Sequence, residues 1–164
     1  MPRPFVPDEF VVPLGFDGPQ FRLEPLGPRH NEQGYEAWTS SIDHIRDLPG
    51  FRSRGDWPYP MSLDENMDDL EMHALHCATR AGFTYTVLDG DAVIGCVSSY
   101  PATAPGHDAS VASWARADRA SLDPVVYRSV SAWLADAWPF ERPAYASRMQ
   151  SSERFAQFQG LVGR

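Results

Sequence analysis

The chain has 164 residues, with 22 acidic against 14 basic side chains and a formal net charge of −8 at pH 7; this length favours one domain with its own hydrophobic core. The acidic charge argues against a surface that follows the phosphates of a nucleic acid. No apolar run approaches the roughly 20 residues of a membrane span and no signal peptide is recognisable, which predicts a cytoplasmic protein that binds neither nucleic acid nor membrane.

Residues 1–20 contain five prolines, too many for regular structure. Large apolar residues such as Phe5 and Phe10 are nevertheless unusual in a disordered tail. We therefore expect an apolar arm that packs either on the domain or on a second copy of the chain. Residues 21–164 are expected to form the domain itself, with a first strand at residues 21–26.

Two helical stretches follow this strand. Residues 29–48 carry apolar side chains at helical spacing, which predicts one broken helix or two short ones. Ser62 and Glu65 have the spacing of a capping box, in which each side chain bonds the backbone N–H of the other residue. A longer helix is therefore expected to begin here and to run to Ala81.

Four residues of this longer helix have the chemistry of metal ligands. They lie three or four positions apart and are Asp69, His73, His76 and Cys77. These four residues lie on one helix, and the sequence has no second ligand cluster, which argues against a metal site. We predict instead that these residues form a solvent-facing flank of the helix and hold no metal.

The clearest pattern lies between residues 83 and 148. Residues 83–88 alternate β-forming side chains, Asp89-Gly90-Asp91 has the composition of a tight turn, and residues 92–100 form a second run, so an antiparallel hairpin is predicted. A third strand is expected at residues 110–115.

A helix and a further strand are expected next. Asp123 is expected to cap a helix at residues 124–138, in which Pro124 takes the first position. Residues 143–146 can then return as a strand parallel to the third one, through a strand–helix–strand crossover.

The order of these elements resembles the GNAT superfamily of acyl-CoA N-acyltransferases, as do short phrases at residues 21–26, 83–89, 93–97 and 132–140. The resemblance implies an α/β fold of three layers, α-β-α, around a mixed central sheet. Only 16 residues follow Arg148, so the last two strands of the family should be lacking. A homodimer or the apolar arm could cover the sheet edge left open.

The resemblance also implies acetyl transfer from acetyl-CoA to a small-molecule amine. The family holds the cofactor pyrophosphate with a glycine-rich loop at a helix N-terminus. The matching residues 116–125 contain no glycine, and Leu122 and Pro124 stand at the two small positions. Asp123 would add a carboxylate there. We expect weaker acetyl-CoA binding than in glycine-loop members, and two functions stay open: an N-acetyltransferase, or a catalytically silent GNAT-fold protein that binds a small molecule or a protein partner.

Five residues are candidates for contacts with the cofactor. By the resemblance, a backbone N–H among Ser113, Trp114 and Ala115 would meet the thioester carbonyl. Arg116 and Arg119 are the local side chains that could contact phosphate directly. The alternative for both arginines is ion pairing with a neighbouring aspartate, at position 118 or 123.

Catalytic and substrate-binding candidates follow from the same resemblance. His107 and Asp108 precede the third strand, where family members often carry a base or a water-positioning group; an ordinary polar loop is the alternative. Tyr145 is a candidate general acid in place of the family's tyrosine, with Tyr127 as the alternative. Trp57 and Tyr59 either line the acceptor pocket or cap the core.

Overall fold

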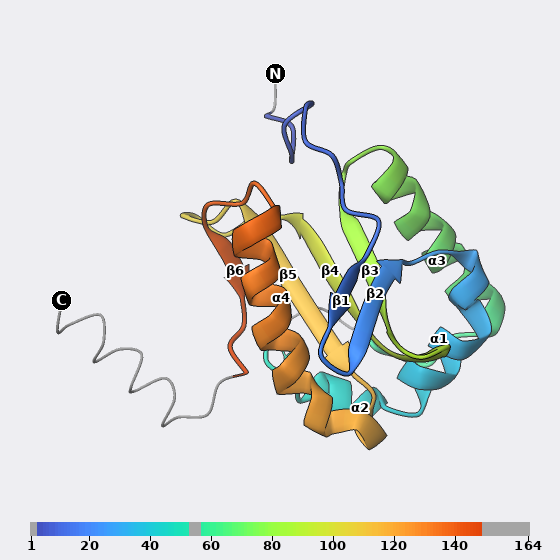
Figure 1. Ribbon diagram of the computed structural model, residues 1–164. Coiled ribbons are helices and arrows are strands. Elements are labelled where there is room, and N and C mark those ends of the chain that lie inside the picture. Colours follow the sequence, from blue (N-terminus) through green and yellow to red (C-terminus); the bar gives the residue numbers. More distant parts are fainter. Residues whose placement is uncertain (1–2, 53–56, 149–164) are drawn as a thin grey trace, which may run out of the picture.

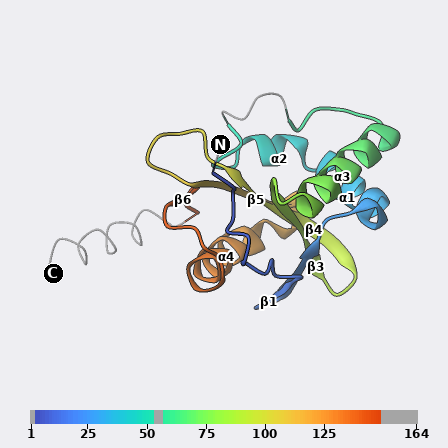
Figure 2. The same cartoon turned by 90° about the horizontal axis from the view of Figure 1, so that it is seen from above.

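The computed structural model describes residues 3–52 and 57–148. One six-stranded sheet forms its centre, with the strands in the order β1-β2-β3-β4-β5-β6. Each pair of adjacent strands from β1 to β5 is antiparallel, whereas β6 lies parallel to β5. Figures 1 and 2 show α1, α2 and α3 on one face of the sheet and α4 on the other, which gives the three layers that were predicted.

The strands are β1 (Phe16–Gly18), β2 (Phe21–Pro25), β3 (Phe83–Asp89), β4 (Ala92–Pro101), β5 (Ala109–Ala115) and β6 (Pro143–Tyr145). The helices are α1 (Asn31–Thr39), α2 (Ile42–Arg46), α3 (Leu63–Ala78) and α4 (Asp123–Ala137), with 3-10 turns η1 (Pro28–His30) and η2 (Ala117–Leu122).

The predicted core of the fold is confirmed. Strands β3 and β4 form the hairpin, and Gly90 in its turn has φ of 60°, a conformation that favours glycine. Helix α4 connects β5 to β6, which pair in parallel from Ala109 opposite Pro143 to Val111 opposite Tyr145. Strand β6 is the last strand among the residues that the structure describes, and no described helix is long and apolar enough to cross a membrane.

The proline-rich arm packs on its own chain, on the face of the sheet that carries α4. Val6 is buried in the core, and Phe5 stacks on Phe140 with 5.0 Å between the ring centroids. The Tyr85 hydroxyl donates to the Pro13 carbonyl at 2.6 Å. The arm is not wholly irregular, because its last residues form β1 and pair with β2. Self-association of the chain stays a prediction.

Helix α3 begins as predicted but faces differently. The Ser62 hydroxyl accepts from the Glu65 backbone N–H at 3.1 Å, which confirms the capping box, and the helix ends before Ala81. The predicted solvent-facing flank is wrong. Asp69 and His73 instead line a cavity against the sheet, because α3 packs over β3 with this side inward.

Candidate functional site

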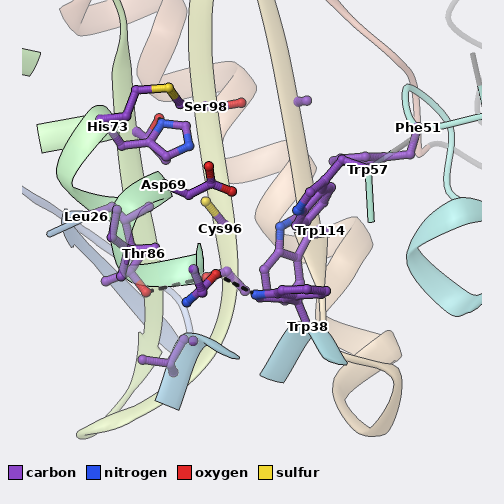
Figure 3. A pocket seen from close by; sticks show the side chains of 18 of the residues that line it. Leu26, Trp38, Phe51, Trp57, Asp69, His73, Thr86, Cys96, Ser98 and Trp114 are labelled. Atoms are coloured by element: carbon purple, nitrogen blue, oxygen red, sulfur yellow. Dashed lines mark hydrogen bonds between the residues drawn. The ribbon is translucent and has the colours of Figure 1, made fainter. Parts of the chain in front are cut away.

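A cavity of about 440 Å³ lies between α1, α3 and the face of the sheet that these helices cover (Figure 3). Its volume is in the range of small-molecule sites. Thr84 and Thr86 supply its floor from β3, because every second residue of a strand faces the same side. At Gly95 a Cβ atom would lie 2.2 Å from the Trp114 carbonyl oxygen, so glycine is needed for β4 to approach β5 here. We call this space the aromatic cavity.

One end of the aromatic cavity is lined by large rings. Trp57 lies between Trp38 and Trp114, with ring centroids 5.7 Å and 6.3 Å away, and Phe51 packs against it at 5.9 Å. Of the two alternatives for Trp57, a pocket residue or a cap of the core, the structure shows features of both: the ring lines the cavity and packs against the core. A role in substrate binding stays a prediction. Tyr59 does not line the cavity and is 42% exposed, so the structure does not bring these two candidates together.

The other end carries one carboxylate. Figure 3 shows the Asp69 carboxylate between the His73 ring and the tryptophans. Burial, and then the negative charges of Asp68 and Glu65, raise the pKa of Asp69 above its usual value. Among the described residues, none donates a hydrogen bond to this carboxylate or forms an ion pair with it. A half-buried carboxylate without a cation is energetically poor, so it favours a positively charged ligand.

His73 is held as a neutral ring. Its Nδ1 lies 2.9 Å from the Tyr100 hydroxyl and 3.0 Å from the Thr84 hydroxyl, and His76 Nδ1 lies 2.9 Å from the same Tyr100 oxygen. Burial, and then the nearby His76, lower the pKa of His73 to about 4. Cys77 packs against the core. The described residues contain no group of three side chains that could hold a metal ion.

The start of α4 differs from the prediction. Leu122 takes the cap position because η2 leads directly into the helix, so Asp123 is the first helical residue and Pro124 follows it. The Asp123 carboxylate is not a cap. Its Oδ2 lies 2.9 Å from Nε of Arg148, and the two side chains are 9% and 3% exposed. Burial raises the pKa of Asp123, and the guanidinium of Arg148 opposes that rise.

The two loop arginines are already paired. Arg116 binds both carboxylate oxygens of Glu36, at 2.7 and 2.9 Å, and also Asp118 at 2.7 Å. These bonds, with Glu36 first, raise the pKa of Arg116. Arg119 pairs with Asp89 at 2.7 Å, not with a loop aspartate as the alternative reading held. With no glycine, a buried Asp123 and both arginines engaged, the residues at this helix start do not fit a pyrophosphate as they stand.

Ser113 and Tyr145 lie together on the α4 side of β5. The Ser113 and Tyr145 hydroxyls are 2.6 Å apart, and the Ser113 carbonyl accepts from Arg148 at 2.7 Å. Burial is the main cause that raises the pKa of Tyr145, so its phenol stays protonated. The Trp114 ring lines the aromatic cavity, on the opposite face, while Ala115 pairs with Gly95 in β4.

The remaining catalytic candidates hold two loops together. Asp108 accepts from the backbone N–H groups of Glu141 and Arg142, at 2.7 and 2.9 Å, and His107 Nδ1 lies 3.1 Å from the Arg142 carbonyl. Both are exposed and neither lines the aromatic cavity. Their catalytic role stays a prediction, and the polar-loop alternative describes the contacts they make.

Sequence reasoning missed the importance of Asp69 and Trp38. One signal was available in β3, where threonines alternate with Phe83, Tyr85 and Val87. Thr84 and Thr86 are buried, and two buried hydroxyls on one face of a strand indicate a polar lining rather than a solvated face.

No family model matches the sequence, and no characterised protein matches it in sequence. Several solved structures match the fold. The ribosomal-protein-S5-alanine acetyltransferase of Vibrio fischeri has a TM-score of 0.61 and 16% identity, over 90% of this chain and 82% of its own. RimL, a ribosomal L7/L12 α-N-protein acetyltransferase, has a TM-score of 0.59 and 12% identity, over 90% and 77%. The microcin C7 self-immunity acetyltransferase MccE, solved with acetyl-CoA and AMP, has a TM-score of 0.61 and 13% identity, over 85% and 76%. At these identities the likeness is one of fold, and the fold is that of GNAT acyltransferases.

Proposed function

We propose that the protein binds a small organic amine, as a cation, in the aromatic cavity, and that acetyl-CoA-dependent N-acetylation of that amine is its function. The observation that carries the proposal is the Asp69 carboxylate, which faces the tryptophans and for which none of the described residues provides a cation. The GNAT fold suggests the acetyl transfer, and the poor fit of the start of α4 to a pyrophosphate means that this transfer would proceed with weakly bound acetyl-CoA.

The two ends of the cavity suit the two parts of such a ligand. An ammonium group beside Asp69 would supply the missing positive charge, and the faces of Trp57 and Trp114 attract a cation or cover an apolar ring. The neutral His73 adds no competing positive charge. The net charge of −8 attracts cations from solution at low ionic strength.

A small molecule is favoured over a protein partner by the size and the apolar lining of the site. The cavity has about 440 Å³ and is lined mostly by apolar side chains, as small-molecule sites are. RimL and the S5 enzyme are acetyltransferases of ribosomal proteins. The aromatic cavity of this chain, at about 440 Å³, has room for a small molecule and not for a folded protein.

A second function is favoured by one observation, the ion pair between Asp123 and Arg148. This pair lies where the family pattern places the cofactor phosphates. The protein would then bind the same amine without transferring an acetyl group to it, as a catalytically silent member of the fold.

Calorimetry with a matched pair of probes tests the binding. We expect 1-naphthylmethylamine to bind and 1-naphthylmethanol, which has the same ring but no charge, to bind at least tenfold more weakly. Asp69→Asn should remove that preference, while Asp68→Asn, an exposed neighbour with the same charge change, should keep it. Equal affinity for both probes would refute the cationic site. Mass spectrometry for the N-acetyl product, with acetyl-CoA added, then separates the transferase from the silent protein.

A further inference from the structure

Strands β5 and β6 diverge soon after they meet. They pair only from Ala109 opposite Pro143 to Val111 opposite Tyr145, although β5 continues to Ala115. Among residues 3–52 and 57–148, no strand lies beside the β6-facing edge of β5 beyond Val111. The start of α4 lies at the same place, because η2 connects the end of β5 to this helix.

The Arg148 side chain lies at this edge. Arg148 donates from Nη2 to the Ser113 carbonyl at 2.7 Å and from Nη1 to the Ala146 carbonyl at 2.9 Å, and its Nε lies 2.9 Å from Asp123 Oδ2. Its side chain is only 3% exposed. The guanidinium thus bridges the open edge of β5 and the first turn of α4.

The Asp123–Arg148 pair has the charge arrangement of a phosphate-binding site with its phosphate bound. A helix N-terminus attracts an anion, and an arginine beside it completes an anion site. Here the anion is the chain's own Asp123 carboxylate, and the cation is Arg148. A phosphate that entered would meet a negative charge already in place, beside an arginine that is already ion-paired with that charge and bonded to two backbone carbonyls.

We propose that the Asp123 carboxylate occupies the place of the cofactor phosphate, so that the Asp123–Arg148 pair competes with coenzyme A and keeps its affinity low. Removal of the carboxylate converts Arg148 into a phosphate ligand. The inference concerns the α4 face of the sheet and does not rest on amine binding in the aromatic cavity.

The test compares coenzyme A and inorganic pyrophosphate as probes, by calorimetry, on the full chain. The unmodified protein should bind coenzyme A no more tightly than millimolar. Asp123→Asn should bind both probes at least tenfold more tightly, and Arg148→Gln added to it should remove the gain. Asp123→Ser, whose hydroxyl suits a helix start, is the second variant, and circular dichroism verifies the fold of each.

Two results would overturn the proposal. One is equal affinity for coenzyme A in the unmodified protein and in folded Asp123→Asn and Asp123→Ser. The other is micromolar binding by the unmodified protein that weakens when the carboxylate is removed. The aromatic cavity lies on the opposite face of the sheet, so amine binding there can be present or absent whichever result coenzyme A gives.

Discussion

Asp69 and His73 lie one helical turn apart on the inward side of α3, and burial shifts their pKa values in opposite directions. Burial makes the ionised form of each side chain unfavourable: it raises the pKa of Asp69 and lowers the pKa of His73 to about 4. At neutral pH the His73 ring is therefore uncharged. For the carboxylate, no described residue provides a counter-charge. Cavity and charge therefore favour a cationic ligand at this point.

The first prediction is that Asp69→Asn stabilises the free protein while it removes amine binding. In the folded state the pKa of Asp69 is above 3.8, its ordinary value, so the ionised form is disfavoured and stability is lost as the pH rises through that range. Asp69→Asn removes this loss and should raise the melting temperature at pH 7 by a few degrees. The gain should vanish near pH 3, where the carboxyl of the unmodified protein is neutral as well.

Asp68→Asn is the control for this prediction. Asp68 is exposed on the same helix, so its substitution changes the net charge equally without altering the cavity lining. Because the Asp68 charge is one cause of the raised pKa of Asp69, Asp68→Asn should show only a smaller part of the rise. A rise in melting temperature as large as that of Asp69→Asn would show that general charge repulsion, and not the cavity, is the cause. Scanning calorimetry at pH 7 and pH 3 measures both variants.

The second prediction concerns the aromatic end of the cavity. Trp57→Leu keeps an apolar side chain but removes the aromatic face, and a cation–π contact out of water is worth about 2 kcal/mol or less. We expect 1-naphthylmethylamine to bind several-fold to tenfold more weakly to this variant, with Trp57→Phe between the two. Tyr59→Leu should leave the affinity unchanged, because Tyr59 does not line the cavity. An equal loss in both leucine variants contradicts the assignment of Trp57.

The third prediction uses two glycines of the cavity lining. Gly95→Ala places a Cβ 2.2 Å from the Trp114 carbonyl oxygen, so β4 and β5 must move apart. Overpacking of this kind typically costs about 1–3 kcal/mol. Gly34→Ala in α1 meets no atom within 4 Å and should stabilise the helix by about 0.5–1 kcal/mol. Urea unfolding measures both changes. If Gly95→Ala left the free energy of unfolding unchanged, β4 and β5 would be able to separate at little cost, which contradicts the prediction.

The elements of the fold could be predicted because their signals are local. The alternation at residues 83–88 and the helical spacing at residues 124–138 each depend on neighbours within a few positions, and both elements formed as expected. Capping at Asp123 was wrong, although the residue type suited it. Its partner Arg148 follows in the sequence after a helix and a strand, so no local pattern predicts that contact.

The aromatic cavity could be predicted only in part. Trp57 was named from its place in the chain, but the cavity is assembled from α1, α3, the loop between α2 and α3, and three strands. Asp69 is preceded by the exposed Asp68 in an acidic stretch, so its sequence context is that of a solvated helix face. Only the packing of α3 over β3 decides which of two adjacent aspartates turns inward.

The last prediction is a loss of stability in mild acid that depends on His73. In the unfolded chain this histidine takes up a proton near pH 6.5, whereas in the fold its pKa is about 4, because the ring is buried and His76 lies close by. The unfolded state therefore binds more protons between these values, and stability falls as the pH is lowered from 6.5 towards 4. The difference amounts to on the order of 3 kcal/mol once the pH is below both values. His73→Gln, which can still bond the Thr84 and Tyr100 hydroxyls but does not titrate, should flatten this slope in urea unfolding at pH 5 and pH 7. If its slope equals that of the unmodified protein, or if NMR shows the folded His73 ring protonating near pH 6.5, the ring is not held neutral and the description of this end of the cavity fails.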